Sequence, residues 1–176
     1  MRLFSGRALP WGARGATRVQ TRAYLAGLAA GTLLLGGCGA YPKDAAGSFE
    51  RAEGGTLVVG VSPHEPWTTV EPVTGDVSGS EAELVRGFAD EMGADVDWRV
   101  GAESELAEWL SDGDIDVAIG GFQADSPWTE EIAFTRPYEE VEAKGGTRKM
   151  VMGVRRGENR MLVELERYLS RATGEI

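Results

Sequence analysis

The residues of this chain best suited to contact a ligand are two tryptophans and a glycine-rich turn. Trp67 follows an apolar segment at 57–61, and the turn Gly120–Gln123 follows another at 115–119. If both segments are parallel strands, these residues lie beyond their carboxyl ends, where open α/β sheets bind ligands. The faces of Trp67 and Trp128 could stack on a ring or a cation, and the glutamine and the glycine amides could add polar contacts. The alternative is that both tryptophans only cover the end of the sheet.

No catalytic or metal-binding arrangement accompanies these residues. His64 is the only histidine, and we interpret it as a solvated loop residue because no cysteine or second histidine lies near it in sequence. Asp114 is typical of a turn before a strand, and the acidic run Glu139–Glu142 is typical of a solvated linker. The sequence contains no nucleophile motif or metal-binding helix. It therefore predicts a protein that is not an enzyme and takes no cofactor or metal.

The first 38 residues resemble a bacterial lipoprotein leader. Residues 1–22 carry five arginines and no acid, Ala23–Gly37 is apolar or small apart from Thr32, and Cys38 follows. These are a basic region, an apolar region and a small-residue cleavage site. The apolar run has 15 residues, whereas a membrane-spanning helix needs roughly 20. The alternative for Cys38 is a buried free thiol. We expect residues 1–37 to be a signal peptide. We expect Cys38 to carry a lipid that contains palmitate and that anchors the chain to the extracytoplasmic side of the cell membrane.

The chain that follows the leader is strongly acidic. Without the five leader arginines, 13 Lys and Arg remain against 28 Asp and Glu, a net charge of −15. Such a chain is repelled by nucleic acid and by anionic lipid surfaces, so we expect no nucleic-acid partner and membrane attachment through the lipid alone. The 139 residues from Cys38 onward suit one domain with a hydrophobic core.

Apolar periodicity predicts one α/β domain over residues 55–172. We predict strands at 57–61, 96–100, 115–119 and 150–154, the second of them half-exposed and at an edge. We predict helices at 81–92, around 106–110 and from Asn159 onward. This order favours a mostly parallel, three-layer sheet of about four strands with flanking helices. Residues 38–54 are expected to be a lipidated, flexible tether, and 173–176 a short tail.

Five short motifs, in order, resemble the first lobe of the bacterial extracellular solute-binding proteins, family 3. They are Leu57–Val61 with Pro66–Trp67, Gly79–Leu84, Gly113–Asp116, Gly120–Gly121 and Phe134–Tyr138. The resemblance covers most of 56–170. It implies a periplasmic-binding-protein-like fold and the role of the substrate-binding lipoprotein of an amino-acid ABC transporter. The expected ligand-binding residues are Trp67, His64, Glu81, Gly121, Phe122, Gln123 and Trp128.

The chain departs from this family in two ways. Family members insert a second lobe after the motif that ends at Tyr138, but here only a linker at 139–149 separates it from the next strand, so the second lobe is absent. Trp128 stands where the family commonly has an arginine that grips the ligand's carboxylate, and tryptophan cannot replace that bidentate donor. An ordinary amino acid would therefore lack part of its usual contacts.

Two functions follow from these observations. The first is a lipid-anchored solute-binding protein, accessory to an ABC importer, that binds an amino-acid-like or amine solute weakly or together with a partner. The second is a lobe without ligand binding that docks on a permease or on a second envelope protein. The two differ at the end of the sheet, which a receptor leaves open for solute and a docking protein buries.

Overall fold

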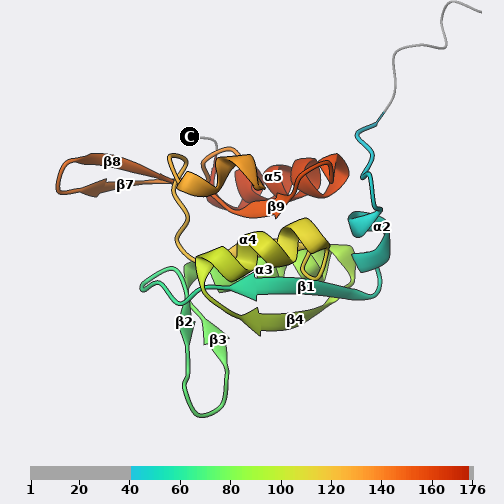
Figure 1. Ribbon diagram of the computed structural model, residues 1–176, viewed down its shortest axis with the longest axis horizontal. Helices are drawn as coiled ribbons and strands as arrows, with labels where there is room; N and C mark the ends of the chain where they lie inside the picture. Colours follow the sequence, from blue (N-terminus) through green and yellow to red (C-terminus); the bar gives the residue numbers. More distant parts are fainter. Residues whose placement is uncertain (1–40, 175–176) are drawn as a thin grey trace, which may run out of the picture. The chain divides into compact units, whose positions relative to one another are not determined.

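The apolar segment Thr56–Val61 forms strand β1 in the interior of a five-stranded sheet (Figure 1). The computed structural model describes residues 41–174, and the leader with Cys38 lies outside them. Leu57, Val59 and Val61 are fully buried on one side of the sheet. On the other side, a Cβ on Gly60 would lie 2.5 Å from a methyl of Ile115 and 2.7 Å from one of Leu106, so a helix packs directly on the strand there.

The sheet has the strand order β4-β1-β5-β9-β6. Its other strands are β4 (Asp95–Val100), β5 (Val117–Ile119), β6 (Ile132–Phe134) and β9 (Gly153–Arg155). Strands β4 and β5 run parallel to β1, whereas β9 is antiparallel to both of its neighbours. The predicted class, a mostly parallel α/β lobe with β4 at its edge, is confirmed. The sequence did not predict β6, and the strand expected at 150–154 is divided between β9 and a separate hairpin strand.

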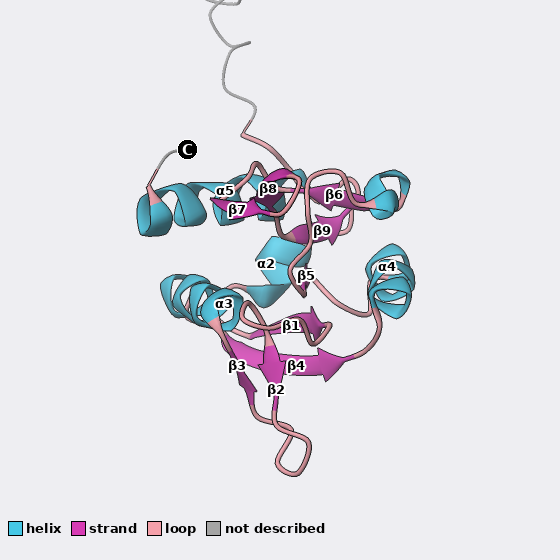
Figure 2. Cartoon of the chain, turned by 90° about the vertical axis from the view of Figure 1, so that its left-hand side faces the viewer, coloured by secondary structure: helices cyan, strands magenta, loops and turns pink. Residues whose placement is uncertain are grey.

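Helices cover both faces of the sheet (Figure 2). They are α3 (Ser80–Met92), α4 (Glu103–Asp112) and α5 (Asn159–Thr173). The apolar residues of α3 and α5 share one core cluster with Leu57, Val59 and Val61. Those of α4 form a second cluster with Ile115 and Phe122. The result is the three-layer arrangement that the helical stripes predict. Among the described residues, no helix is long and apolar enough to span a bilayer.

Two hairpins project from the body near the carboxyl end of β1 (Figure 1). The first pairs β2 (Thr69–Val70) with β3 (Val77–Ser78). The second pairs β7 (Glu139–Ala143) with β8 (Gly146–Met150). The second hairpin occupies the place of the predicted 139–149 linker.

The segment before β1 is packed on the body, unlike the flexible tether expected at 38–54. Helix α2 (Ser48–Ala52) buries Phe49 and Ala52. The buried Glu158 carboxylate accepts hydrogen bonds from Ala46 N (2.7 Å), Ser48 N (2.9 Å) and Ser48 Oγ (2.6 Å). Burial alone would raise the pKa of Glu158, but these hydrogen bonds outweigh it and the pKa is lowered. Asp44 adds to this packing, because its carboxylate accepts from Phe49 N at 2.8 Å.

Candidate functional site

Glu81 joins three segments at the carboxyl end of the sheet. It lies in the first turn of α3 and is fully buried. Its Oε2 accepts hydrogen bonds from Gly120 N (2.8 Å) and Gly121 N (3.0 Å), in the turn after β5. Its Oε1 accepts from the Tyr138 hydroxyl at 2.6 Å, just before β7. One carboxylate thus fixes α3, the glycine turn and the base of the β7–β8 hairpin relative to one another.

Burial dominates the electrostatics of this contact. It raises the pKa of Glu81, although the hydrogen bonds from Tyr138, Gly121 and Gly120 act in the opposite direction. Burial also raises the pKa of Tyr138, and the neighbouring Glu81 carboxylate raises it further. The tyrosine is therefore a permanent donor. Glu81 is an internal acceptor whose oxygens are already used within the fold.

The loop after β1 packs on the glycine turn. His64 and Trp67 meet edge to face, with ring centroids 5.3 Å apart. Gly121 has φ of +67°, and a Cβ there would lie 2.9 Å from His64 Cγ and 3.1 Å from Trp67 Cε3. Only glycine allows this close approach. The site therefore requires glycine at this position for steric as well as conformational reasons.

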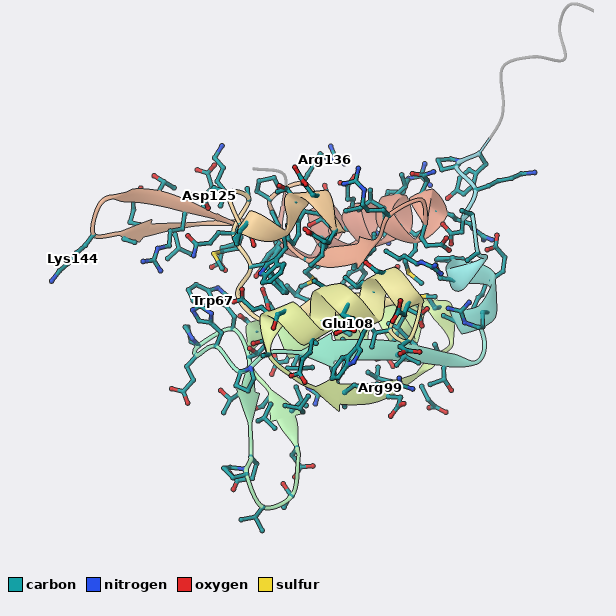
Figure 3. The ribbon with its side chains drawn as sticks, in the orientation of Figure 1. Trp67, Arg99, Glu108, Asp125, Arg136 and Lys144 are labelled. Carbon is teal, nitrogen blue, oxygen red and sulfur yellow. The ribbon has the colours of Figure 1, made fainter. Side chains whose placement is uncertain are left out.

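The hairpin reaches the same place from the other side. Trp67 points toward the β7–β8 hairpin (Figure 3), and its indole Nε1 donates to Glu139 Oε2 at 3.4 Å. The tryptophan is buried, with 8% of its surface exposed, whereas Glu139 is solvent-exposed. We use the name rim site for His64, Trp67, Gly121, Gln123 and Glu139. It combines an aromatic ring, an imidazole, an amide and a carboxylate.

Three grooves on the described surface include residues of the hairpin. The largest, about 550 Å³, lies between the start of α3, the end of α5 and the base of β7. A second, about 370 Å³, lies between Gln123–Asp125 and the hairpin. A third, about 310 Å³, lies between α5 and residues 136–140. All three volumes fall within the range of small-molecule sites, which is about 300–1,000 Å³. The hairpin thus supplies concave surface that a bare lobe would lack.

The chain matches the family pattern of the bacterial extracellular solute-binding proteins, family 3, over residues 57–174. The chain belongs to this family. No curated protein matches its sequence.

Solved structures of amino-acid-binding proteins have the same fold at low sequence identity. One is the arginine-bound domain 1 of TmArgBP, with 24% identity, a TM-score of 0.61, and coverage of 69% of this chain and 97% of that one. A truncated, arginine-bound ArgBP from T. maritima has 14% identity and a TM-score of 0.61, with 70% and 99% coverage. An ancestral cationic amino acid solute-binding protein has 13% identity and a TM-score of 0.60, with 70% and 92% coverage.

The structure brings together part of the ligand-binding set expected for a family 3 protein. His64, Trp67 and Gly121 are in mutual contact, and Glu81 lies beneath them. Gln123 is half-buried beside the hairpin, where it pairs with Met150. Phe122 differs from the expectation because its ring is 2% exposed and packs in the core beside α4. The sequence of the turn does not indicate which of its side chains enters the core and which faces the ligand side.

Trp128 also differs from the expectation. It lies in the 3-10 helix η1 (Pro127–Glu130), packs beside the α4 core, and its Nε1 donates to Glu103 Oε2 at 3.2 Å. It therefore covers the side of the lobe and does not fold back toward Trp67.

Sequence reasoning missed the contribution of the hairpin. Glu139 was interpreted as part of a solvated linker, yet it contacts Trp67. The available signal was that Glu139 directly follows Tyr138, the last residue of the family-like motif Phe134–Tyr138. The acidic residues Asp114 and Asp116 do not form a cation or ligand site. Asp116 is buried, and its carboxylate accepts hydrogen bonds from Arg51 and from Val58 N. Among the described residues, no group of three potential metal ligands converges.

Proposed function

We propose that this family 3 chain is a one-lobe solute-binding protein that takes an amino-acid-like or amine solute at the rim site. The observation that carries the proposal is the contact of Trp67 with both Gly121 and Glu139, which places an indole ring and a carboxylate at one sheet end. An aromatic face next to a carboxylate is suited to an ammonium or guanidinium group. The role is binding, without catalysis.

Glu139 compensates in part for the missing lobe. In this family the acid that holds a ligand's amino group is expected in the second lobe, and this chain replaces that lobe with the β7–β8 hairpin. Glu139 stands at the base of this hairpin, exposed and next to the rim. The arginine-bound domain 1 of TmArgBP supports the idea that one lobe can hold a solute. Trp128, which stands where the family commonly has an arginine, cannot bind a ligand's carboxylate. The site therefore favours amines over zwitterionic amino acids.

We further propose that Cys38 anchors the chain by lipid and that an ABC-type importer is its partner. The packed segment near Asp44 supports a close attachment. Five residues lie between Cys38 and Asp44, and the six residue steps that join them span at most about 20 Å. The lobe would then be held within roughly that distance of the membrane surface.

One observation favours the alternative, a docking lobe without a solute. The Trp67 indole nitrogen already has a protein acceptor, and the ring is mostly buried. A solute must therefore displace Glu139 or bind around it. In a docking protein, the same contacts would simply close the end of the sheet.

Thermal unfolding of residues 41–176 with candidate solutes distinguishes these functions. Amino acids, polyamines, quaternary amines and small organic acids are each tested for an increase in Tm. A solute at one hundred times its Kd stabilises the native state by about 2.7 kcal/mol. The shift should disappear in Glu139→Gln and Trp67→Ala and persist in Trp98→Ala, a matched tryptophan on the edge strand β4. If no solute shifts the Tm of the cooperatively folding protein, the docking function is favoured instead.

A further inference from the structure

The β7–β8 hairpin is symmetric about its turn. Its opposed residues are Glu139 with Met150, Glu140 with Lys149, Val141 with Arg148, Glu142 with Thr147, and Ala143 with Gly146. Each pair is equally distant from the point between Lys144 and Gly145. A single straight strand covering 139–150 would therefore form the same pairs with a second, antiparallel copy of itself. The register makes no distinction between a hairpin in one chain and a ribbon from two chains.

The turn is poorly suited to the closed hairpin. Only Lys144 and Gly145 lie between the last opposed residues. Two-residue hairpins favour type I′ or II′ turns, both of which require positive φ at the first turn position. That position holds a lysine, for which positive φ is costly. The two glycines that follow it, Gly145 (+111°) and Gly146 (+135°), both have positive φ.

Few contacts hold the turn of the hairpin closed, the side-chain bond from Thr147 to Glu142 being the one next to it. Lys144 lies at the far end of the projecting ribbon (Figure 3). A Cβ on Gly145 or Gly146 would meet nothing within 4 Å. Residues 144–149 are all exposed, and the ribbon joins the body mainly at its base, through Ala124 N to Lys149 O (2.9 Å) and Tyr138 N to Met150 O (3.0 Å). Opening the turn therefore costs few contacts.

We propose that the hairpin is a hinge at which two copies of this chain exchange the segment from Gly146 through α5. Each 139–150 segment then runs as one strand against its counterpart, and each lobe is completed by the partner's β9 and α5. The ion pair between Glu140 and Lys149 (3.4 Å) and the hydrogen bond from Thr147 to Glu142 (3.0 Å) become contacts between chains. Both turns are removed, and the contacts of β9 with β5 and β6 are retained.

Charge excludes the simpler way of pairing two such hairpins. The β7 edge carries Glu139, Glu140 and Glu142, whereas the β8 edge carries Arg148 and Lys149. A two-fold dimer that joins hairpins edge to edge places β7 on β7 or β8 on β8, so like charges face each other. Exchange instead keeps acidic β7 against basic β8. Exchange also joins the two lobes through the two antiparallel 139–150 segments, so that both chains contribute to each lobe.

Oligomeric state in two opposite turn variants tests the exchange. Residues 41–176, which contain every described contact of the lobe, are refolded over a range of concentrations and measured by light scattering after gel filtration. Lys144→Asn creates an Asn-Gly turn that suits the closed hairpin and should raise the dimer dissociation constant about tenfold, since two turns reclose per dimer. Gly145→Val disfavours the closed turn and suits an extended strand, so it should shift the protein toward dimer. Circular dichroism shows that each variant is folded.

A cysteine pair identifies which chains are joined. Val141→Cys with Arg148→Cys places thiols on opposed residues in a segment that otherwise lacks cysteine. Exchange predicts disulfides between chains in the wild-type turn background and more of them with Gly145→Val, while Lys144→Asn gives disulfides within one chain. Monomers at every concentration with both the wild-type turn and Gly145→Val would overturn the proposal. Dimers that contain only disulfides within chains would also overturn it, since they would use another surface.

Discussion

Replacing Glu81 by alanine should destabilise the lobe by about 3–5 kcal/mol. The change removes the acceptor of three hydrogen bonds, those from Gly120 N, Gly121 N and the Tyr138 hydroxyl. A buried donor left without an acceptor costs about 1–3 kcal/mol. Removing the buried carboxylate also removes the cost of its desolvation, which offsets part of the summed cost of the three donors. The expected loss of stability therefore lies toward the lower end of that sum. Such a loss is a large fraction of the 5–15 kcal/mol typical of a domain.

Urea unfolding of residues 41–176, followed by circular dichroism, measures this loss. Glu81→Gln is the matched control, since it keeps the size of the side chain and one oxygen that can serve the two glycine amides, and should cost only about 1–2 kcal/mol. Tyr138→Phe removes one donor and leaves the other two bonds intact. The double variant Glu81→Ala with Tyr138→Phe should therefore cost less than the sum of the single changes. A loss below about 1 kcal/mol in Glu81→Ala, with the same dependence on urea, would refute the view that this carboxylate joins the three segments.

Two further outcomes follow from the buried carboxylates. The folded-state pKa of Glu81 is raised above its unfolded value of about 4.3, so the folded protein holds this proton more tightly. The stability that Glu81 contributes should therefore fall as the pH rises from about 4.3 through the folded pKa. Urea unfolding across this interval should show the fall in the wild type and not in Glu81→Gln. Glu158→Ala removes the acceptor of three hydrogen bonds, those from Ala46 N, Ser48 N and Ser48 Oγ, and should destabilise the lobe by about 2 kcal/mol. It should also expose α2, which hydrogen exchange would detect as faster exchange over residues 46–52 with little change in β1. Unchanged exchange over residues 46–52 would show that α2 is held by Phe49 alone.

The sequence predicted the elements whose burial leaves a clear pattern. The run Leu57–Val61 is buried on both faces and therefore continuously apolar, and α3 has one buried stripe that includes Val85, Phe88 and Ala89. The strand β6 has only three residues, which is too short for a period to appear. Most residues of the β7–β8 hairpin are polar and exposed, so its strands resemble a linker in composition.

The site was less predictable than the fold for a different reason. The rim site depends on which way side chains point in irregular segments, and composition does not determine this. Phe122 and Gln123 are neighbours in one turn, yet the first enters the core and the second does not. Glu81 stands in the first turn of a helix, where acidic residues are normally solvated. Its burial is explained by hydrogen bonds from two distant segments, the glycine turn and Tyr138.

The position of β9 determines when the lobe can be completed. This strand lies between β5 and β6 in space but follows both in the chain, and it is the one strand to which β6 is bonded. While the polypeptide is synthesised, β4, β1 and β5 can associate, but the rest of the sheet waits for the last quarter of the chain. A nascent chain therefore cannot complete its sheet, or the core beneath α5, until nearly its whole length has emerged.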